Sequence, residues 1–180
     1  MSDKEITLVI GGCRSGKSRY ALDSADQIRG CNKKFLATSV PRDREMDLRV
    51  ARHKAERGFD WQTIEEPVEI HRVIETCSHE SDVILVDCLT LWVSNLMEQG
   101  KQEPEVMDHA RRLVHALARA RCPVFLVTNE VGYGIVPDNV LARQFRDLAG
   151  FVNQAVAGAA HRVVMTVAGI DVQIKPPLKG

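Results

Sequence analysis

A glycine-rich loop directly after an apolar run constrains this chain more than any other feature. Residues 11–18, GGCRSGKS, fit the pattern G-x-x-x-x-G-K-[ST] and follow the run Ile6–Ile10. A buried strand that ends in such a loop and continues into a helix is the context of a phosphate-binding loop, whose N–H groups point inward at phosphate oxygens. The positive end of the helix faces the same anion. The pattern predicts a nucleotide site in which Lys17 contacts the β- and γ-phosphates and Ser18 holds Mg²⁺. The alternative is an ordinary glycine-rich turn, which the agreement of strand, loop and helix signals disfavours.

Strand-like and helix-like segments alternate along the chain, without internal repeats. The run Val83–Val86 is typical of a strand covered on both faces. The alternation predicts one α/β domain over residues 1–180, with helices on both faces of a mostly parallel sheet and a C-terminal hairpin around Gly169. The strands are predicted at 6–10, 34–38, 61–64, 83–86, 124–127, 163–167 and 172–175, and the helices at 17–29, 43–57, 67–76, 89–99, 105–121 and 140–157, with loops at 100–104 and 129–139.

Composition and charge exclude several classes of protein. A length of 180 residues is typical of one domain with a real core. The formal net charge of zero argues against a nucleic-acid binder, which normally carries a basic excess. The five cysteines form no C-x-x-C pair and lack metal-ligand spacing with histidine, which argues against a structural zinc site and for reduced thiols. Without a signal-peptide core or a long apolar run, we expect a cytoplasmic protein.

Candidate site residues follow the predicted strands, because loops at the carboxyl ends of parallel strands build the site of such a sheet. This rule selects residues 11–18, the stretch after Thr38, the pair Asp87-Cys88 and the stretch Thr128-Asn129-Glu130. Asp87 follows four apolar residues, as in a Walker B motif, and would hold Mg²⁺ directly or through water, or else cap the next helix. The polar segment 128–137 would sense a γ-phosphate or bind a second substrate, or is a plain loop.

One histidine differs from the other five because cations surround it. On a helix, Arg49, His53 and Arg57 share a face at i, i+4 and i+8. These cations favour a neutral imidazole, which suits nucleophilic attack on phosphorus, and they would attract a polyphosphate. Spacing alone nevertheless favours a solvated basic helix face. His109 and His115 are expected on the surface of the helix at 105–121.

Several motifs of this chain resemble those of the bifunctional adenosylcobinamide kinase / adenosylcobinamide-phosphate guanylyltransferase family. The resemblance extends from about residue 6 to 175 and rests on five blocks. The first alone would indicate only a P-loop NTPase, whereas the last two together are highly specific. The blocks are Gly11–Ser18, Arg49–Lys54, Trp61–Glu65, Thr128–Pro137 and Leu141–Gln154.

The resemblance implies a RecA-like P-loop fold and two reactions. ATP or GTP phosphorylates adenosylcobinamide, and GTP then donates GMP to the adenosylcobinamide phosphate. The second reaction runs through a guanylylated histidine, which His53 matches, with Lys17 as the other catalytic residue. Ser18 and Asp87 are implied for Mg²⁺, and the protein is expected to be a homo-oligomer, a trimer. The implied nucleotide contacts are Gly11, Gly12, Cys13, Arg14, Ser15, Gly16, Lys17, Ser18, Thr38, Ser39, Val40, Lys54, Ala55, Glu56, Arg57, Glu65 and Asp87.

Two positions depart from the family pattern. Asp87 often corresponds to Glu in relatives, which shortens the reach to a metal by one methylene. Arg52 corresponds to His in some relatives, which leaves His53 as the only nucleophile of its segment. Two other functions remain open: a different P-loop small-molecule kinase, which needs no nucleophilic histidine, and a nucleotide-binding regulatory module without catalysis.

Overall fold

The computed structural model describes residues 4–39, 58 and 60–176, which contain a single seven-stranded sheet. The strand order is β3-β2-β4-β5-β1-β6-β7. All neighbouring strands pair in parallel except β6 and β7, which form an antiparallel hairpin. The expected mostly parallel sheet with a C-terminal hairpin is therefore confirmed. The strands are β1 (Ile6–Gly11), β2 (Lys33–Ala37), β3 (Trp61–Glu65), β4 (Val83–Asp87), β5 (Val124–Asn129), β6 (Arg162–Val167) and β7 (Ile170–Lys175).

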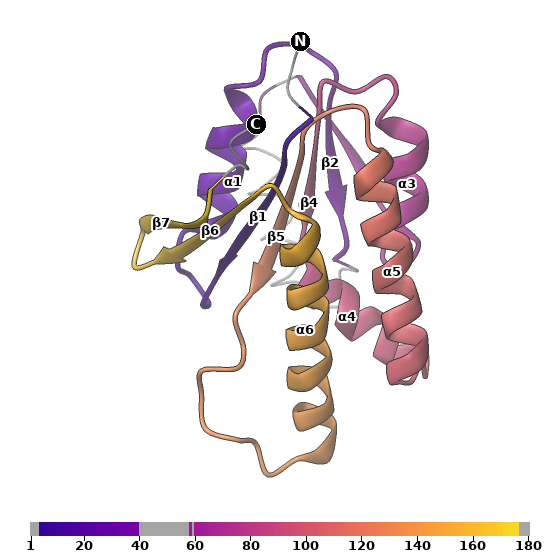
Figure 1. Ribbon diagram of the computed structural model, residues 1–180, viewed down its shortest axis with the longest axis vertical. Coiled ribbons are helices and arrows are strands. Elements are labelled where there is room, and N and C mark those ends of the chain that lie inside the picture. The colour runs from indigo at the N-terminus through magenta and orange to yellow at the C-terminus, as the bar shows by residue number, and fades with distance from the viewer. Residues whose placement is uncertain (1–3, 40–57, 59, 177–180) are drawn as a thin grey trace.

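Helices cover both faces of this sheet and make three layers (Figure 1). On one face lies α1 (Lys17–Asp26), whose Ala21 and Ala25 pack with the apolar side chains of β1, β2, β4 and β5. The larger core fills the opposite face, where it joins the sheet to four helices. These are α3 (Ile70–Cys77), α4 (Leu89–Glu98), α5 (Glu103–Arg119) and α6 (Val140–Ala159).

The run Val83–Val86 of β4 is apolar at every position because both of its faces are covered by helices. Ile84 and Val86 belong to the core beneath α3–α6, while Val83 and Leu85 belong to the core beneath α1. Successive side chains of a strand point to opposite faces, so a strand covered on both faces must be apolar at every position. The prediction for this segment is confirmed.

The start of α3 departs from the predicted one. We expected Pro67 to open the helix, but α3 begins at Ile70. The carboxylate of Glu66 accepts hydrogen bonds from the N–H groups of Val68 and Glu69 at 2.8 and 2.9 Å. This local bonding by a side chain holds the segment in a turn, which competes with the first turn of a helix.

The start of α5 also differs, in the opposite direction. Residues 103 and 104 were expected in a loop but form the first turn of α5. Gln102 and Glu105 form a capping box, with the Gln102 N–H donating to Glu105 Oε2 at 2.9 Å. Proline is tolerated in the first turn, where its missing N–H has no intrahelical partner. Pro104 therefore helps to begin this helix rather than preventing it.

The expected surface position of His109 is wrong, whereas His115 is exposed as predicted. His109 packs edge-on against the buried Trp92, with ring centroids 6.4 Å apart. The helix α5 is covered by α3 on one side and α6 on another, so its buried face is wider than one amphipathic stripe.

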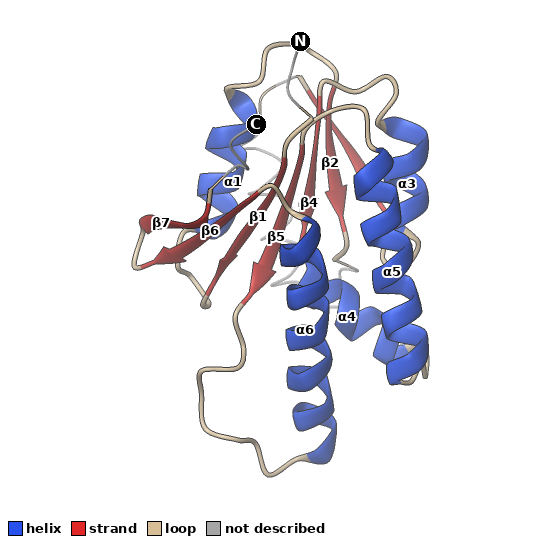
Figure 2. Ribbon diagram, viewed as in Figure 1, coloured by secondary structure: helices blue, strands red, loops and turns tan. Residues whose placement is uncertain are grey.

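The carboxyl ends of the six parallel strands point to one edge of the sheet, the lower edge in the view of Figure 2. The loops that leave this edge are those selected from the sequence. The helix predicted at 43–57 lies outside the described residues. Across the part of the chain that is described, none of the helices combines the length and apolar character needed to cross a membrane.

Candidate nucleotide site

The glycine-rich loop joins β1 to α1 and curls back on itself. The Ser15 N–H donates to the Gly12 carbonyl at 3.3 Å, and Gly16 takes a left-handed conformation with φ 98° immediately before the helix. No side chain caps the N-terminus of α1, and its first turn carries no acidic residue. The free N–H groups at this end of the helix therefore face the loop as a ready-made anion site. The strand, loop and helix expected from the motif are confirmed.

The β6–β7 hairpin contacts the glycine-rich loop and holds it by hydrogen bonds to Ser15. Ser15 Oγ lies 2.7 Å from Thr166 Oγ1 in a buried hydrogen bond, and the Gly169 N–H donates to the Ser15 carbonyl at 2.9 Å. A Cβ at Gly11 would lie 2.5 Å from both hydroxyl oxygens, so only glycine fits at the end of β1. Thr166 and Gly169 were not predicted for this role, since no local pattern marks a contact made across the sheet.

Lys17 and Ser18 occupy the first turn of α1. Lys17 is 8% exposed, and its ammonium donates to the Gly12 carbonyl at 2.9 Å across the mouth of the loop. This bond holds the Lys17 side chain beside the N–H groups of the loop. Ser18 is half-buried on the same turn. We call the loop 11–16 together with Lys17 and Ser18 the phosphate cradle.

The end of β4 brings Asp87 and Cys88 to the same region. Burial, and then the charge of Asp87, raise the pKa of the Cys88 thiol to about 11, while Lys17 acts on it in the opposite direction. Both charges are thus within electrostatic reach of one thiol. Cys88 itself stays protonated near neutral pH and is not a nucleophile.

Thr38 links the ends of β2 and β4. Its hydroxyl donates to the Cys88 carbonyl and accepts from the Cys88 N–H, both at 2.8 Å, and its N–H donates to the Asp87 carbonyl at 3.1 Å. Thr38 is fully buried, so it positions the strand ends, while the adjacent Ser39 is half-buried. A nucleotide contact by either residue stays a prediction.

Glu65 ends β3 at the same edge. Ala37 of β2 is in register with Glu65 on one side and with Asp87 on the other. The two acids therefore flank one residue of β2 at the carboxyl edge. The topology puts the described residues chosen from the sequence on one edge of the sheet, but β2, β4 and β5 separate Glu65 from the strand that leads into the cradle. The remaining ones, Val40, His53, Lys54, Ala55, Glu56 and Arg57, lie outside the described residues.

A buried polar network fixes the end of β5 next to the cradle. Thr128 Oγ1 donates to Asn153 Oδ1 at 2.7 Å and lies 3.2 Å from Thr90 Oγ1. The Asn129 N–H donates to Thr90 Oγ1 at 2.7 Å, and Asn153 Nδ2 donates to the Asn129 carbonyl at 3.2 Å. We call Thr90, Thr128, Asn153 and the Asn129 backbone the strand-end network. Thr90 was not selected from the sequence, and Asn153 entered only as part of a family block.

The donor set suits Mg²⁺ rather than a transition metal. A serine hydroxyl and one carboxylate, Ser18 and Asp87, are hard oxygen ligands, and Mg²⁺ is usually held by one or two carboxylates together with substrate phosphates. Over the described ranges, no group of three or more His, Cys, Asp or Glu side chains could hold a metal ion by itself. The residues present therefore fit a metal that arrives with a nucleotide.

Comparisons with known proteins agree with this geometry. The family model described as cobinamide kinase / cobinamide phosphate guanyltransferase matches residues 7–174. The chain is 39% identical to the bifunctional adenosylcobalamin biosynthesis protein CobP of Pseudomonas aeruginosa, over 96% of each chain. It is 42% identical to the bifunctional adenosylcobalamin biosynthesis protein CobU of Salmonella typhimurium, over 93% of this chain and 98% of that protein.

Solved structures extend the likeness to the fold alone. The flagellar accessory protein FlaH from Methanocaldococcus jannaschii superposes with a TM-score of 0.55 at 15% identity, covering 99% of this chain and 81% of that one. A KaiC-like protein from Pyrococcus horikoshii gives a TM-score of 0.54 at 16% identity, covering 90% and 70%. These neighbours have P-loop NTPase-like folds, so the expected RecA-like P-loop class is confirmed.

Proposed function

Because the chain belongs to the cobinamide kinase / cobinamide phosphate guanyltransferase family, we propose that it catalyses two consecutive reactions of cobalamin biosynthesis. In the first, ATP or GTP phosphorylates the hydroxyl of the aminopropanol arm of adenosylcobinamide. In the second, GTP transfers GMP to that phosphate, giving adenosylcobinamide-GDP and pyrophosphate. The observation that carries the proposal is the phosphate cradle, which lies within a family match that spans residues 7–174.

In both reactions the cradle binds the triphosphate of the nucleotide. Backbone N–H groups of residues 11–16 and the N-terminus of α1 face the phosphate oxygens, and Lys17 neutralises charge that develops on the phosphorus being transferred. Phosphoryl transfer requires positioning and charge stabilisation more than covalent chemistry by the protein. The hydrogen bonds from Thr166 and Gly169 to Ser15 keep the cradle in place.

Ser18 and Asp87 would hold Mg²⁺ at the edge of the cradle. When bound, the ion would neutralise phosphate charge and orient the triphosphate. The hydroxyl comes from the first turn of α1 and the carboxylate from the end of β4. These elements contact each other across the sheet face, which supports a shared site.

The second reaction needs a nucleophile for the α-phosphorus of GTP, and we assign this role to His53 from the family motif alone. The imidazole would take the GMP group with release of pyrophosphate, and the phosphate of the acceptor would then displace the histidine. Such a covalent intermediate divides one difficult transfer into two displacements. Further nucleotide contacts are assigned to Thr38, Ser39 and Glu65, and to Val40 and residues 54–57.

An apolar strip supports self-association, while the trimer is proposed from the family resemblance alone. Ile170, Val172 and Ile174 alternate along the edge strand β7 and are 67%, 50% and 57% exposed. A contiguous exposed apolar surface of this kind marks an interaction site in a protein that works in water. We place the enzyme in the cytoplasm, where its nucleotide substrates and reduced thiols belong.

The test combines two labels on the purified protein. With γ-labelled ATP, wild-type protein should transfer label to adenosylcobinamide. With GTP labelled in the α-phosphate and no corrinoid, it should form an acid-labile, alkali-stable adduct that maps to His53 and is lost in His53→Ala. Phosphorylation without any adduct would favour a plain small-molecule kinase. Nucleotide binding without either product would favour a regulatory module.

A further inference from the structure

We propose that Glu130 is the general base of the kinase reaction and accepts the proton of the acceptor hydroxyl. This assignment rests on the proposed function, since it concerns one of the two reactions. It is carried by the position of Glu130 beside the phosphate cradle, by the bonds that fix its backbone, and by the glycine over which its carboxylate lies.

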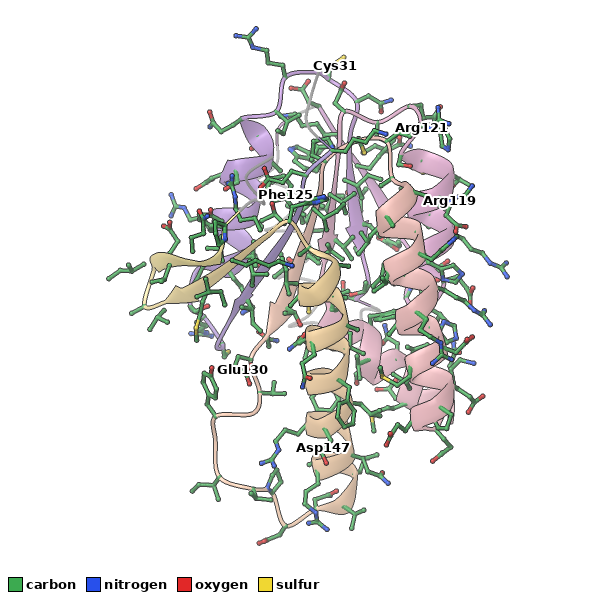
Figure 3. The ribbon with its side chains drawn as sticks, in the orientation of Figure 1. Cys31, Arg119, Arg121, Phe125, Glu130 and Asp147 are labelled. Carbon is green, nitrogen blue, oxygen red and sulfur yellow. The ribbon has the colours of Figure 1, made fainter. Side chains whose placement is uncertain are left out.

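Sheet topology places Glu130 between the cradle and the strand that carries Asp87. The strand β5 lies between β1 and β4, and its last residue, Asn129, is in register with Gly11 at the end of β1. The Glu130 N–H donates to the Gly11 carbonyl at 3.0 Å. Figure 3 shows Glu130 where the chain leaves β5, at the edge of the sheet where the cradle opens.

The backbone that carries Glu130 is fixed on both sides of the strand. The Asn129 N–H is held by Thr90 and the Asn129 carbonyl by Asn153, while the Glu130 N–H is held by Gly11. The three partners belong to α4, α6 and the end of β1, and none of them belongs to the loop that follows Glu130. A general base must be held in place with this kind of support, because a small displacement removes most of its effect.

The carboxylate of Glu130 accepts a hydrogen bond from its own loop. The Gly132 N–H donates to Glu130 Oε1 at 2.6 Å, and a Cβ built at Gly132 would lie 2.8 Å from the same oxygen. A glycine thus allows the loop to fold against the acid. Glu130 stays half-exposed, so a substrate hydroxyl can approach it from the side of the solvent.

The two reactions differ in their need for a base. In the kinase step, the acceptor oxygen forms a bond to the γ-phosphorus, the bond from that phosphorus to the β–γ bridging oxygen breaks, and ADP or GDP leaves. The hydroxyl proton passes to the Glu130 carboxylate and then to water. In the GMP transfer the acceptor is a phosphate monoester, with a second pKa of about 6, so its attacking oxygen is already ionised. Glu130 therefore serves the first reaction alone.

The test compares Glu130→Gln with wild type in both reactions. The amide keeps the size and the bond from Gly132 but cannot take a proton. We expect kcat for phosphorylation of adenosylcobinamide to fall about 100-fold. Labelling by α-labelled GTP, and GMP transfer to preformed adenosylcobinamide phosphate, should stay within about twofold of wild type. Asp138→Asn, an exposed acid at the far end of the same loop, is the charge-matched control and should leave both reactions intact.

A pair of glycine variants tests the position of the carboxylate without removing it. Gly132→Ala should displace the Glu130 side chain and lower kcat for the kinase step about tenfold, with little change in melting temperature, because a flexible side chain can yield. A Cβ at Gly158, in the last turn of α6, meets nothing within 4 Å, so Gly158→Ala should behave as wild type in both reactions.

The outcomes separate this assignment from the proposed function. Full kinase activity in Glu130→Gln, or an equal loss of both reactions in that variant, would overturn the role of Glu130. The function proposed for the wild-type protein would be unaffected by either result. A wild-type protein that phosphorylates no corrinoid would overturn both. A selective loss of the kinase step, with the same loss at a smaller scale in Gly132→Ala, supports the assignment.

Discussion

Two clusters of buried polar side chains lie among the helices α3–α6, and they differ in how completely their atoms are bonded. The strand-end network, Thr90, Thr128, Asn153 and the Asn129 backbone, hydrogen-bonds every side-chain polar atom it contains. The histidine cluster, which consists of Glu69, His71 and His109, does not. Within the described ranges, its atoms Glu69 Oε2, His71 Nδ1 and His109 Nδ1 are buried without a hydrogen-bond partner.

The contacts of the histidine cluster are long. His71 Nε2 lies 3.6 Å from Glu69 Oε2, and His109 Nδ1 lies 3.9 Å from Glu69 Oε1. The two imidazole rings have centroids 6.2 Å apart. Both distances to the Glu69 carboxylate are too long for a directional hydrogen bond. The short ion pair of Glu69 is with Arg72, outside the cluster, where Arg72 Nε lies 3.2 Å from Glu69 Oε2. The His109 ring packs edge-on against Trp92, and the His71 ring packs edge-on against His109.

The difference shows which buried polar groups position the active edge and which only occupy the core. A fully bonded network specifies one arrangement, because each broken bond leaves a buried partner unpaired. The strand-end network does this at the point where the chain passes from β5 to Glu130. His71 Nδ1 and His109 Nδ1 have no such bonds to lose, so an apolar ring in place of His109 should cost little.

The largest effect is expected from Asn153→Leu, which keeps the size of a buried side chain but removes two hydrogen bonds. Thr128 Oγ1 would keep only its contact with Thr90, and the Asn129 carbonyl would lose the bond from Asn153. We expect a loss of about 3 kcal/mol in the free energy of unfolding, measured by urea denaturation, with a fall in kinase activity. A loss below about 1 kcal/mol would contradict the comparison.

A smaller effect is expected from Thr90→Val, which replaces one hydroxyl by a methyl group of similar size. The Asn129 N–H would lose its acceptor at 2.7 Å. The expected cost is about 1.5 kcal/mol, from the same urea titration. Because Thr90 and Asn153 hold the N–H and the carbonyl of the same residue, Asn129, the double variant should lose less than the sum of the two single losses. Simple additivity would show that the two bonds act independently.

Local patterns were sufficient to predict the cradle and the edge at which it opens. The motif in residues 11–18 specifies strand, loop and helix within one stretch of chain, and the rule for parallel sheets then brings Asp87 and Glu130 to the same edge. These predictions succeeded because they depend on contacts between neighbours in sequence, and on a general rule of topology.

The supporting contacts could not be predicted in the same way. Ser15 and Thr166 are 151 positions apart, and neither residue has a neighbour in sequence that indicates the bond. His109 was assigned to a surface because periodicity reports one apolar stripe, whereas two neighbouring helices bury α5 from different sides. In each case tertiary packing decided a position that the local pattern left open.

His109→Phe tests the other side of the comparison. Phenylalanine keeps the edge contact with Trp92 and removes a buried nitrogen that has no hydrogen-bond partner among the described residues. We expect the free energy of unfolding at neutral pH to stay within about 1 kcal/mol of wild type, or to rise. A loss as large as that of Asn153→Leu would mean that the cluster is bonded in solution, and the contrast would disappear.

The smallest effect is a pH dependence of stability that belongs to His109. Burial lowers the pKa of His109 below its ordinary 6.5; Glu69 opposes this, and Lys101, Arg112 and His71 add to it. Between the lowered pKa and 6.5 the unfolded chain therefore binds more protons than the folded one, so stability is complete above 6.5 and is lost as the pH falls below it. Urea titrations at about pH 7.5 and about pH 5.5 should show a smaller difference for His109→Phe than for wild type.

The matched control for this measurement is His115→Gln, which removes an exposed histidine from the same helix. It should leave the difference between the two pH values as large as in wild type, because His115 is exposed and lies outside the buried histidine cluster. If His115→Gln reduced the difference and His109→Phe did not, the acid sensitivity would arise at the surface. Protonation of the histidine cluster would then leave the free energy of unfolding unchanged, as substitution of His109 is expected to do. Incomplete hydrogen bonding in the core would then carry no cost in stability at low pH.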